Sequence, residues 1–135
     1  MVAQPDQVGV NEIVLRRIVK DIIYIKLTPP YIVERVAFNP SKRDIDGISL
    51  FRETLSSVQE VAVAGANPKG YFVARLRVSD IYALGLTLVP TDGPLPGHVI
   101  IPEINWNIRK TLRDRLQEYT IALANMASNN VVEAV

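Results

Sequence analysis

Cysteine is absent from this chain of 135 residues, and histidine occurs only once. Without cysteine the protein has no disulfide, no thiolate nucleophile and no cysteine-ligated zinc. A single histidine also excludes a histidine-rich metal site within one subunit. We therefore expect no bound metal and no other cofactor.

Long apolar runs and an excess of one charge are missing as well. No apolar segment approaches the roughly 20 residues that cross a bilayer, and the first residues lack the basic and apolar regions of a secretory signal. The 15 basic and 14 acidic residues give a net charge of +1, which provides no broad positive field for nucleic acid. We expect a cytoplasmic protein without membrane association, and nucleic acid is disfavoured as its partner.

The composition is that of an ordinary globular protein, with 48% hydrophobic and 21% charged residues. The length fits a single domain. The sequence predicts one α+β domain over residues 11–128, with residues 1–10 and 129–135 flexible. We expect a compact mixed or mainly antiparallel sheet of about five strands, with short helices and a long C-terminal helix.

Strands are predicted where β-branched and aromatic residues dominate. Residues 71–78 alternate most clearly, with Phe72, Ala74, Leu76 and Val78 on one face. Residues 12–20 fit two structures: a helix capped by Asn11, which we favour, or a strand, because β-branched residues dominate the segment. Further extended segments are predicted at residues 22–27, 31–38, 48–52, 86–89 and 98–101.

Two short helices are predicted from capping residues. Ser56, with Glu60 nearby, starts a helix through Val63 that Gly65 closes. Ser79 caps a second helix that ends at Gly85. Residues 71–89 are therefore expected to form a strand–helix–strand unit.

The last predicted helix covers residues 107–127 and carries a narrow apolar seam. Such a seam either packs on the sheet of its own domain or contacts a protein partner or a second copy of the chain. It is shorter than the ~3–4 heptads that indicate a coiled coil, which favours packing on the domain itself. The candidate interaction residues with this spacing are Leu112, Leu116, Tyr119, Leu123 and Met126.

Candidate catalytic residues lie in two polar segments beside apolar strands. His98 is the only histidine, and an ordinary imidazole pKa near ~6.5 suits a general acid or base. Ser49 and Asp46 are possible companions, and Arg52 is a possible anion ligand. The simpler interpretations are that Asp46 and Gly47 form a turn and that His98 is a structural hydrogen-bonding residue. Ser49 also lacks the Gly-x-Ser-x-Gly motif of a hydrolase.

An aromatic and basic strand face is the remaining candidate. Arg75 and Arg77 share one face of the predicted strand with Tyr71, which superficially resembles an RNA-binding platform. The ribonucleoprotein motif is absent, and the near-neutral charge argues against this use.

Several short motifs in residues 16–104 resemble those of a group of small uncharacterised bacterial proteins. That group shares an Asp-Gly-Leu-Ser-like segment and a later Pro-x-His-x-x-Ile segment. They correspond here to residues 46–49, with Ile48 in place of leucine, and to residues 96–101. The other shared segments are residues 16–18, 38–40, 73–76, 84–86 and 89–90. The resemblance implies a bacterial cytoplasmic origin, attaches no activity and leaves the final helix outside it.

The function that these observations favour is a non-enzymatic binding or assembly module of a bacterial cytoplasmic system. It would act through its sheet face or its C-terminal helix. The alternative is a small enzyme or a toxin-like activity directed at nucleotides or nucleic acid. That activity would use His98 with Ser49 and either Asp46 or Arg52.

Overall fold

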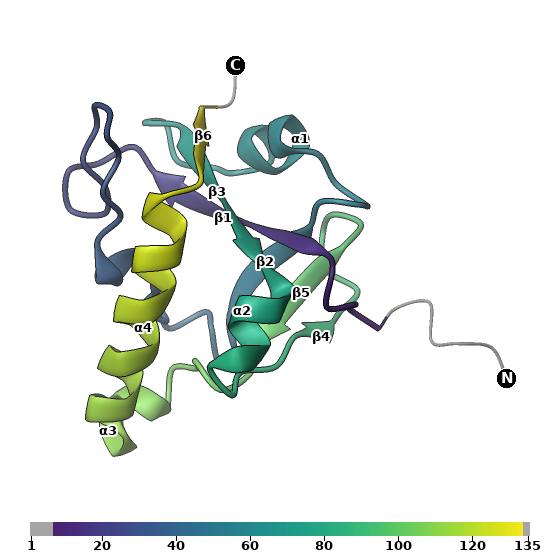
Figure 1. Cartoon of the computed structure of the whole chain (residues 1–135), viewed down its shortest axis with the longest axis vertical. Helices are drawn as coiled ribbons and strands as arrows, with labels where there is room; N and C mark the ends of the chain where they lie inside the picture. The colour runs from purple at the N-terminus through teal and green to yellow at the C-terminus, as the bar shows by residue number, and fades with distance from the viewer. Residues whose placement is uncertain (1–6, 134–135) are drawn as a thin grey trace, which may run out of the picture.

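The computed structural model describes residues 7–133, except for the side chains of residues 109 and 110. The predictions for residues 1–6 and 134–135 lie outside this range. Strands and short helices alternate until one long helix near the C-terminus (Figure 1). The elements are β1 (Ile13–Val19), the 3₁₀ helix η1 (Arg35–Phe38), β2 (Ile48–Arg52), α1 (Val58–Val63), β3 (Tyr71–Arg77), α2 (Val78–Ala83), β4 (Val89–Pro90), β5 (His98–Ile101), α3 (Ile108–Thr111), α4 (Arg113–Ser128) and β6 (Val131–Glu133).

The strands form one open antiparallel sheet of six strands in the order β4-β5-β2-β1-β3-β6. This confirms the predicted α+β fold and its mainly antiparallel sheet. Both faces of the sheet are covered. The larger core lies under η1, α2 and α4, and a smaller core lies under α1. In Figure 1, α4 runs along one side of the sheet, away from α1.

The segment predicted as a helix at residues 12–20 is the central strand β1, so that expectation was wrong. β1 pairs with β2 along one edge and with β3 along the other. Its apolar side chains fill both cores: the β-branched Val14 and Ile18 lie in the larger core, and Leu15 lies in the smaller. Burial on two faces together with pairing on two edges outweighs the single capping signal from Asn11.

Residues 22–34 do not form the predicted strands. Asp21 starts a turn here: its main-chain oxygen accepts from the N–H groups of Tyr24 and Ile25, and its side chain accepts from Ile23 N. These local bonds compete with a sheet ladder. The two arms of the loop meet in a single isolated bridge between Ile25 and Val33. The second predicted segment, residues 31–38, ends in η1.

Helix α1 begins one residue later than predicted, because Ser57 caps it and Ser56 does not. Ser57 Oγ accepts from Glu60 N at 3.1 Å, and Glu60 Oε1 accepts from Ser57 N at 2.9 Å, which is a capping box. The buried Ser56 instead donates to Pro96 O at 2.5 Å and ties this loop to the segment before β5.

Helix α2 follows β3 without a break, and Ser79 does not cap it. Gly85 has a φ of +84° after this helix, as its predicted C-terminal role requires. The strand predicted at residues 86–89 is reduced to the two residues of β4. β4 lies at the opposite end of the sheet from β3 and β6, so residues 71–89 are not a compact unit.

The predicted helix over residues 107–127 is two helices, because Leu112 leaves the helical conformation with φ −134° and ψ 55°. α4 packs on η1 and β3. Its seam is therefore covered by the chain itself: Leu116 and Leu123 are buried, and Tyr119 and Met126 pack against the same core. Only Leu112 of the candidate interaction residues is exposed, at 54%.

Both ends of the predicted domain extend further than expected. Residues 131–133 were predicted to be flexible but form β6, which pairs with Phe72, Val73 and Ala74 of β3. Val8 is buried in the larger core. The sheet and the larger core therefore include residues on both sides of the range 11–128.

The turn predicted at Asp46 and Gly47 brings β2 close to the end of β5. Gly47 has a φ of +144°, and a β-carbon there would lie 2.4 Å from the main-chain oxygen of Ile101. Only glycine fits this conformation and this approach. The turn fixes the start of β2 and therefore the position of Ser49.

Candidate functional sites

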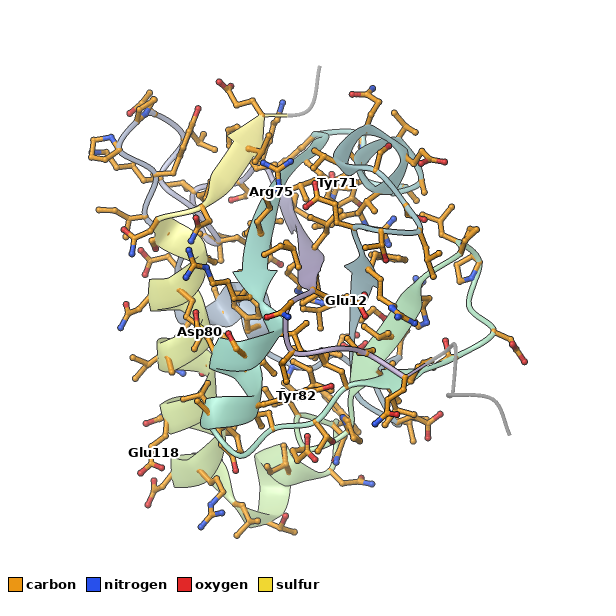
Figure 2. All side chains as sticks on the ribbon, turned by 45° about the vertical axis from the view of Figure 1, so that its right-hand side comes forward. Glu12, Tyr71, Arg75, Asp80, Tyr82 and Glu118 are labelled. Carbon is orange, nitrogen blue, oxygen red and sulfur yellow. The ribbon has the colours of Figure 1, made fainter. Side chains whose placement is uncertain are left out.

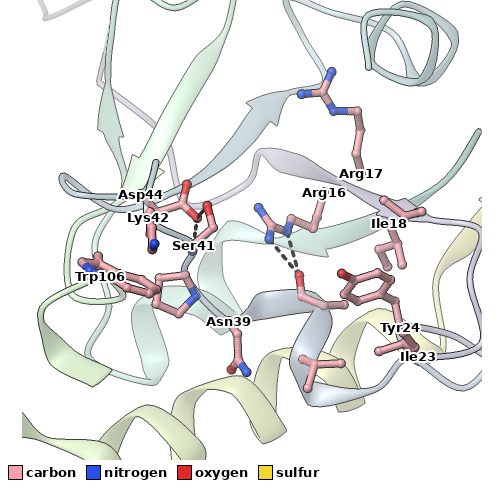
Figure 3. Close-up of a pocket in the computed structure, with 14 residues that line it drawn as sticks. Arg16, Arg17, Ile18, Ile23, Tyr24, Asn39, Ser41, Lys42, Asp44 and Trp106 are labelled. Carbon is pink, nitrogen blue, oxygen red and sulfur yellow. Dashed lines mark hydrogen bonds between the residues drawn. The ribbon is translucent and has the colours of Figure 1, made fainter. Parts of the chain in front are cut away.

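Two adjacent arginines of β1 place positive charge on opposite faces of the sheet. Neighbouring residues of a strand alternate in direction, and the side chains of Arg16 and Arg17 leave β1 on opposite sides (Figure 3). Arg16 points to the face that carries η1, and Arg17 points to the face that carries α1. Each face has its own polar group of residues.

Arg16 reaches beneath β1 and is held there by main-chain oxygens. Its Nε and Nη2 donate to Ala37 O at 3.2 and 2.8 Å, and its Nη1 donates to Ser49 O at 2.9 Å. The guanidinium also lies 5.5 Å from the centre of the Phe38 ring. Burial lowers the pKa of Arg16 to about 10, and the charge of Asp44 opposes this effect. Arg16 therefore keeps its positive charge at neutral pH.

The guanidinium of Arg16 borders a pocket between β1, η1 and the loop that follows η1. The cavity volume is about 600 Å³, within the range of small-molecule sites. Tyr24 and Trp106 contribute aromatic side chains, and Lys42 adds a second positive charge at an exposed position (Figure 3). The pocket is thus apolar in part and basic in part, a combination that suits a small anion.

No carboxylate of the described residues forms an ion pair with Arg16. The three ion pairs among the described side chains involve other arginines and a lysine. Asp44 is near enough to affect the Arg16 pKa, but its carboxylate accepts from Ser41 N at 2.7 Å and from Ser41 Oγ at 3.2 Å. One N–H on Nη1 and one on Nη2 of Arg16 therefore have no acceptor in the described part of the chain.

On the other face, the structure brings His98 and Ser49 together. His98 Nε2 lies 2.9 Å from Ser49 Oγ, and His98 Nδ1 is hydrogen-bonded to Thr91 Oγ1. Gly93 N donates to the same Thr91 oxygen at 3.1 Å. The His98 ring also packs edge-on against Phe51, with 5.3 Å between ring centres. A serine hydroxyl, which can act as a nucleophile, and an imidazole, which can act as a base, are thus in contact within one subunit.

Asp46 and Arg52 do not join this pair. Asp46 is exposed in the turn before β2, and none of the hydrogen bonds described for residues 7–133 joins it to His98. Arg52 follows Ser49 by three positions in β2 and therefore points to the opposite face. There it binds Glu12 through Nε at 2.9 Å and Nη2 at 2.7 Å.

Burial, and then the positive charge of Arg17, lower the pKa of His98 below its usual 6.5. The neutral imidazole is therefore favoured in the folded protein at neutral pH. Neutral imidazole is the form that accepts a proton from a serine hydroxyl.

A pH titration of stability tests this state of His98. Protonation is easier in the unfolded chain, so His98 costs stability as the pH falls below about 6.5 towards the lower folded pKa. We expect wild-type protein to lose more stability between pH 7.5 and 5.5 than His98→Gln, by up to about 1.4 kcal/mol per pH unit. Urea unfolding at each pH measures the difference. Equal pH dependence in the two proteins would contradict the lowered pKa.

Tyr71 and Arg75 lie along β3 (Figure 2), and both make contacts within the chain. Arg75 Nη2 binds Glu53 Oε2 at 2.7 Å, and Tyr71 OH accepts from Asn67 N at 3.0 Å. Arg17 lies over the Tyr71 ring, 5.5 Å from its centre. Arg75 and Arg77 are both exposed, but Arg75 is paired with Glu53 and Tyr71 is covered by Arg17.

Sequence reasoning missed the Arg16 pocket and the role of Thr91. One signal was available for the pocket: two arginines interrupt the otherwise apolar segment IVLRRIV of β1. A charge in the middle of a buried strand requires a partner or a cavity. No comparable signal marked Thr91, because its contact with His98 depends on how the loop before β5 folds back.

The comparisons with known proteins found no relative from which a function could be proposed. The chain matches no protein-family model, no curated protein and no solved structure. The resemblance to small bacterial proteins therefore stays a prediction. In residues 7–133 no group of three or more histidine and acidic side chains is arranged to hold a metal ion. None of the helices in that range has the length and apolar composition needed to cross a bilayer.

Proposed function

We propose that this protein is a binding module for a small carboxylate or phosphate anion, held by Arg16 in the pocket beside η1. The observation that carries the proposal is the guanidinium of Arg16, which is partly buried, charged and not paired with a carboxylate of the described chain. Buried charges in proteins are normally paired. An anion in the pocket would supply the missing partner.

The hydrogen-bonding geometry of Arg16 supports an anion with two oxygens. Nε and Nη2 share Ala37 O along one edge of the guanidinium, and Nη1 reaches Ser49 O on another side. The remaining N–H groups belong to the two terminal nitrogens, which together bind carboxylate or phosphate in a bidentate manner. Asp44 also lines the pocket and would oppose an anion, so the positive charges of Arg16 and Lys42 have to outweigh it.

This proposal keeps the binding module that the sequence favours and places its site on the sheet face. The bacterial cytoplasmic setting remains part of the hypothesis. Assembly through the C-terminal helix has less support, because Leu116 and Leu123 are buried against the protein's own core. The enzyme alternative is supported by the Ser49–His98 contact alone.

The single tryptophan provides a direct test, because Trp106 lines the pocket. We expect a saturable change in its fluorescence on titration with inorganic phosphate or acetate at constant ionic strength. Arg16→Met should abolish saturation, because it removes the charge and both free N–H groups. Arg77→Met removes an equal charge from an exposed position on β3 and should leave the titration unchanged.

A second variant covers the case in which Arg16→Met fails to fold. Lys42 is exposed at the pocket, so Lys42→Glu should fold normally. The reversed charge should weaken the binding of the anion, raising its dissociation constant by about threefold or more. A wild-type titration that never saturates, or one that both pocket variants reproduce, would exclude the proposed site.

A further inference from the structure

The Ser49–His98 pair has the geometry of an activated serine. The 2.9 Å between Ser49 Oγ and His98 Nε2 lies within the ~2.6–3.2 Å expected of a nucleophile and its base. Both residues are partly buried. We propose that Ser49 is a nucleophile for acyl transfer from a small carboxylic ester, with His98 as its general base. This proposal is independent of the Arg16 pocket.

The imidazole of His98 is held in place on three sides. Thr91 Oγ1 is hydrogen-bonded to its Nδ1, and Gly93 N donates a hydrogen bond to the same Thr91 oxygen. Phe51 packs against the ring, and a β-carbon at Gly93 would lie 2.4 Å from His98 Cγ. A third group that orients the base is part of the general design of catalytic serines. Threonine provides orientation here without the negative charge of an aspartate.

Ser49 differs from the other serines with described side-chain bonds in what it contacts. Its hydroxyl has the imidazole as its described partner. Ser56 donates to Pro96 O, and Ser128 donates to Ala124 O at 2.8 Å. Ser41 donates to the carboxylate of Asp44 at 3.2 Å, and that carboxylate also accepts from Ser41 N. The alternation of β2 and its register with β5 place Ser49 and His98 as diagonal neighbours on one face.

Arg17 supplies a fixed positive charge on the same face. Its guanidinium lies 5.1 Å from the centre of the Phe51 ring and 5.5 Å from that of Tyr71. It donates through Nη1 to Val61 O at 3.3 Å. Its charge acts on His98, which contacts the serine. A preorganised cation of this kind stabilises the oxyanion of a tetrahedral intermediate.

The proposed step balances with water as the second reactant. Ser49 Oγ forms a bond to the acyl carbon while His98 Nε2 takes the hydroxyl proton. The bond from that carbon to the alcohol oxygen then breaks, and His98 returns the proton to the leaving alcohol. Water, deprotonated by His98, attacks the acyl-serine and releases the acid and the free Ser49 hydroxyl.

The test is acylation by p-nitrophenyl acetate, read by peptide mass spectrometry. We expect an acetyl group on Ser49, together with release of nitrophenolate, and none on Ser79. Ser79 is an exposed serine of the same chain without a described base, so it reports unselective acylation. Ser49→Ala should remove the adduct while keeping the fold, because this hydroxyl has His98 as its one described partner.

Variants of the base complete the test. His98→Gln should reduce acetylation of Ser49 by at least about tenfold. Thr91→Val keeps the shape of the side chain and should reduce it to a smaller extent, with circular dichroism confirming the fold of each variant. Absence in wild type of both a Ser49 adduct and nitrophenolate release that depends on Ser49 would overturn the proposal. Equal labelling of Ser49 and Ser79, or full labelling in folded His98→Gln, would overturn it as well.

Discussion

Arg52→Met should lower the free energy of unfolding by about 3 kcal/mol or more. The side chain of Arg52 is 8% exposed, and that of its partner Glu12 is 16% exposed. Glu12 also accepts from Gly9 N at 2.8 Å. Removing the arginine leaves a largely buried carboxylate without its cation, which is the costly way to break an ion pair. Urea unfolding at pH 7 measures the loss.

The chain contains a matched control for this prediction. Arg75 and Glu53 form an ion pair of the same length, 2.7 Å, but their side chains are 44% and 28% exposed. Arg75→Met should cost less than about 1 kcal/mol, because solvent screens an exposed pair. Similar losses in Arg52→Met and Arg75→Met would show that burial of the first pair does not matter.

The same ion pair predicts a pH dependence. The hydrogen bond from Arg52 is the largest cause that lowers the pKa of Glu12 below its usual 4.5. Glu12 therefore stabilises the fold above about pH 4.5, and this contribution is lost as the pH falls towards its lower folded pKa. In Arg52→Met this part of the acid sensitivity should disappear. The double variant Glu12→Gln/Arg52→Met should recover part of the stability lost by Arg52→Met.

Sequence patterns predicted those elements of the fold whose side chains alternate or whose ends carry a clear turn. β3 was predicted within one residue because its apolar residues face one core in strict alternation. β2 and β5 were predicted with their observed bounds, since Gly47 and Gly97 introduce them at positive φ. For these segments, local pattern and tertiary structure require the same conformation.

The errors arose where long-range pairing decided the structure. β1 carries buried apolar residues on both faces because it is central, and this removes the alternation that distinguishes a half-buried strand from a helix. Residues 131–133 become β6 only because the edge of β3 is open to them. Neither fact can be read from a window of neighbouring residues.

For the candidate sites, too, local sequence identified residues, while long-range structure decided which of them meet. Ser49 and His98 were identified by residue type, and their meeting depends on the antiparallel register of β2 and β5. Alternation along β2 also determines that Arg52 points away from them. The Arg16 pocket depends on η1 and the loop after it, whose path no residue pattern specified.

Leu123→Ala should lower the free energy of unfolding by about 2–5 kcal/mol without changing the molar mass of the protein. Leu123 is fully buried in the larger core, where α4 packs on η1 and β3. The change leaves a cavity that rigid neighbours fill only in part. Leu112 is the control, because it belongs to the same predicted seam but is 54% exposed. Leu112→Ala should change stability by less than about 0.5 kcal/mol.

Urea unfolding and light scattering together distinguish the two interpretations of the seam. If it is internal packing, Leu123→Ala unfolds at lower urea and elutes with the mass of wild type. If it is an interface between copies, the wild type is an oligomer and Leu123→Ala dissociates it with little loss of stability per chain. The burial of both Leu116 and Leu123 by the chain's own elements favours the first result. In that case a partner of α4 would have to bind its exposed side, where Ile121 is 47% exposed, and not the seam.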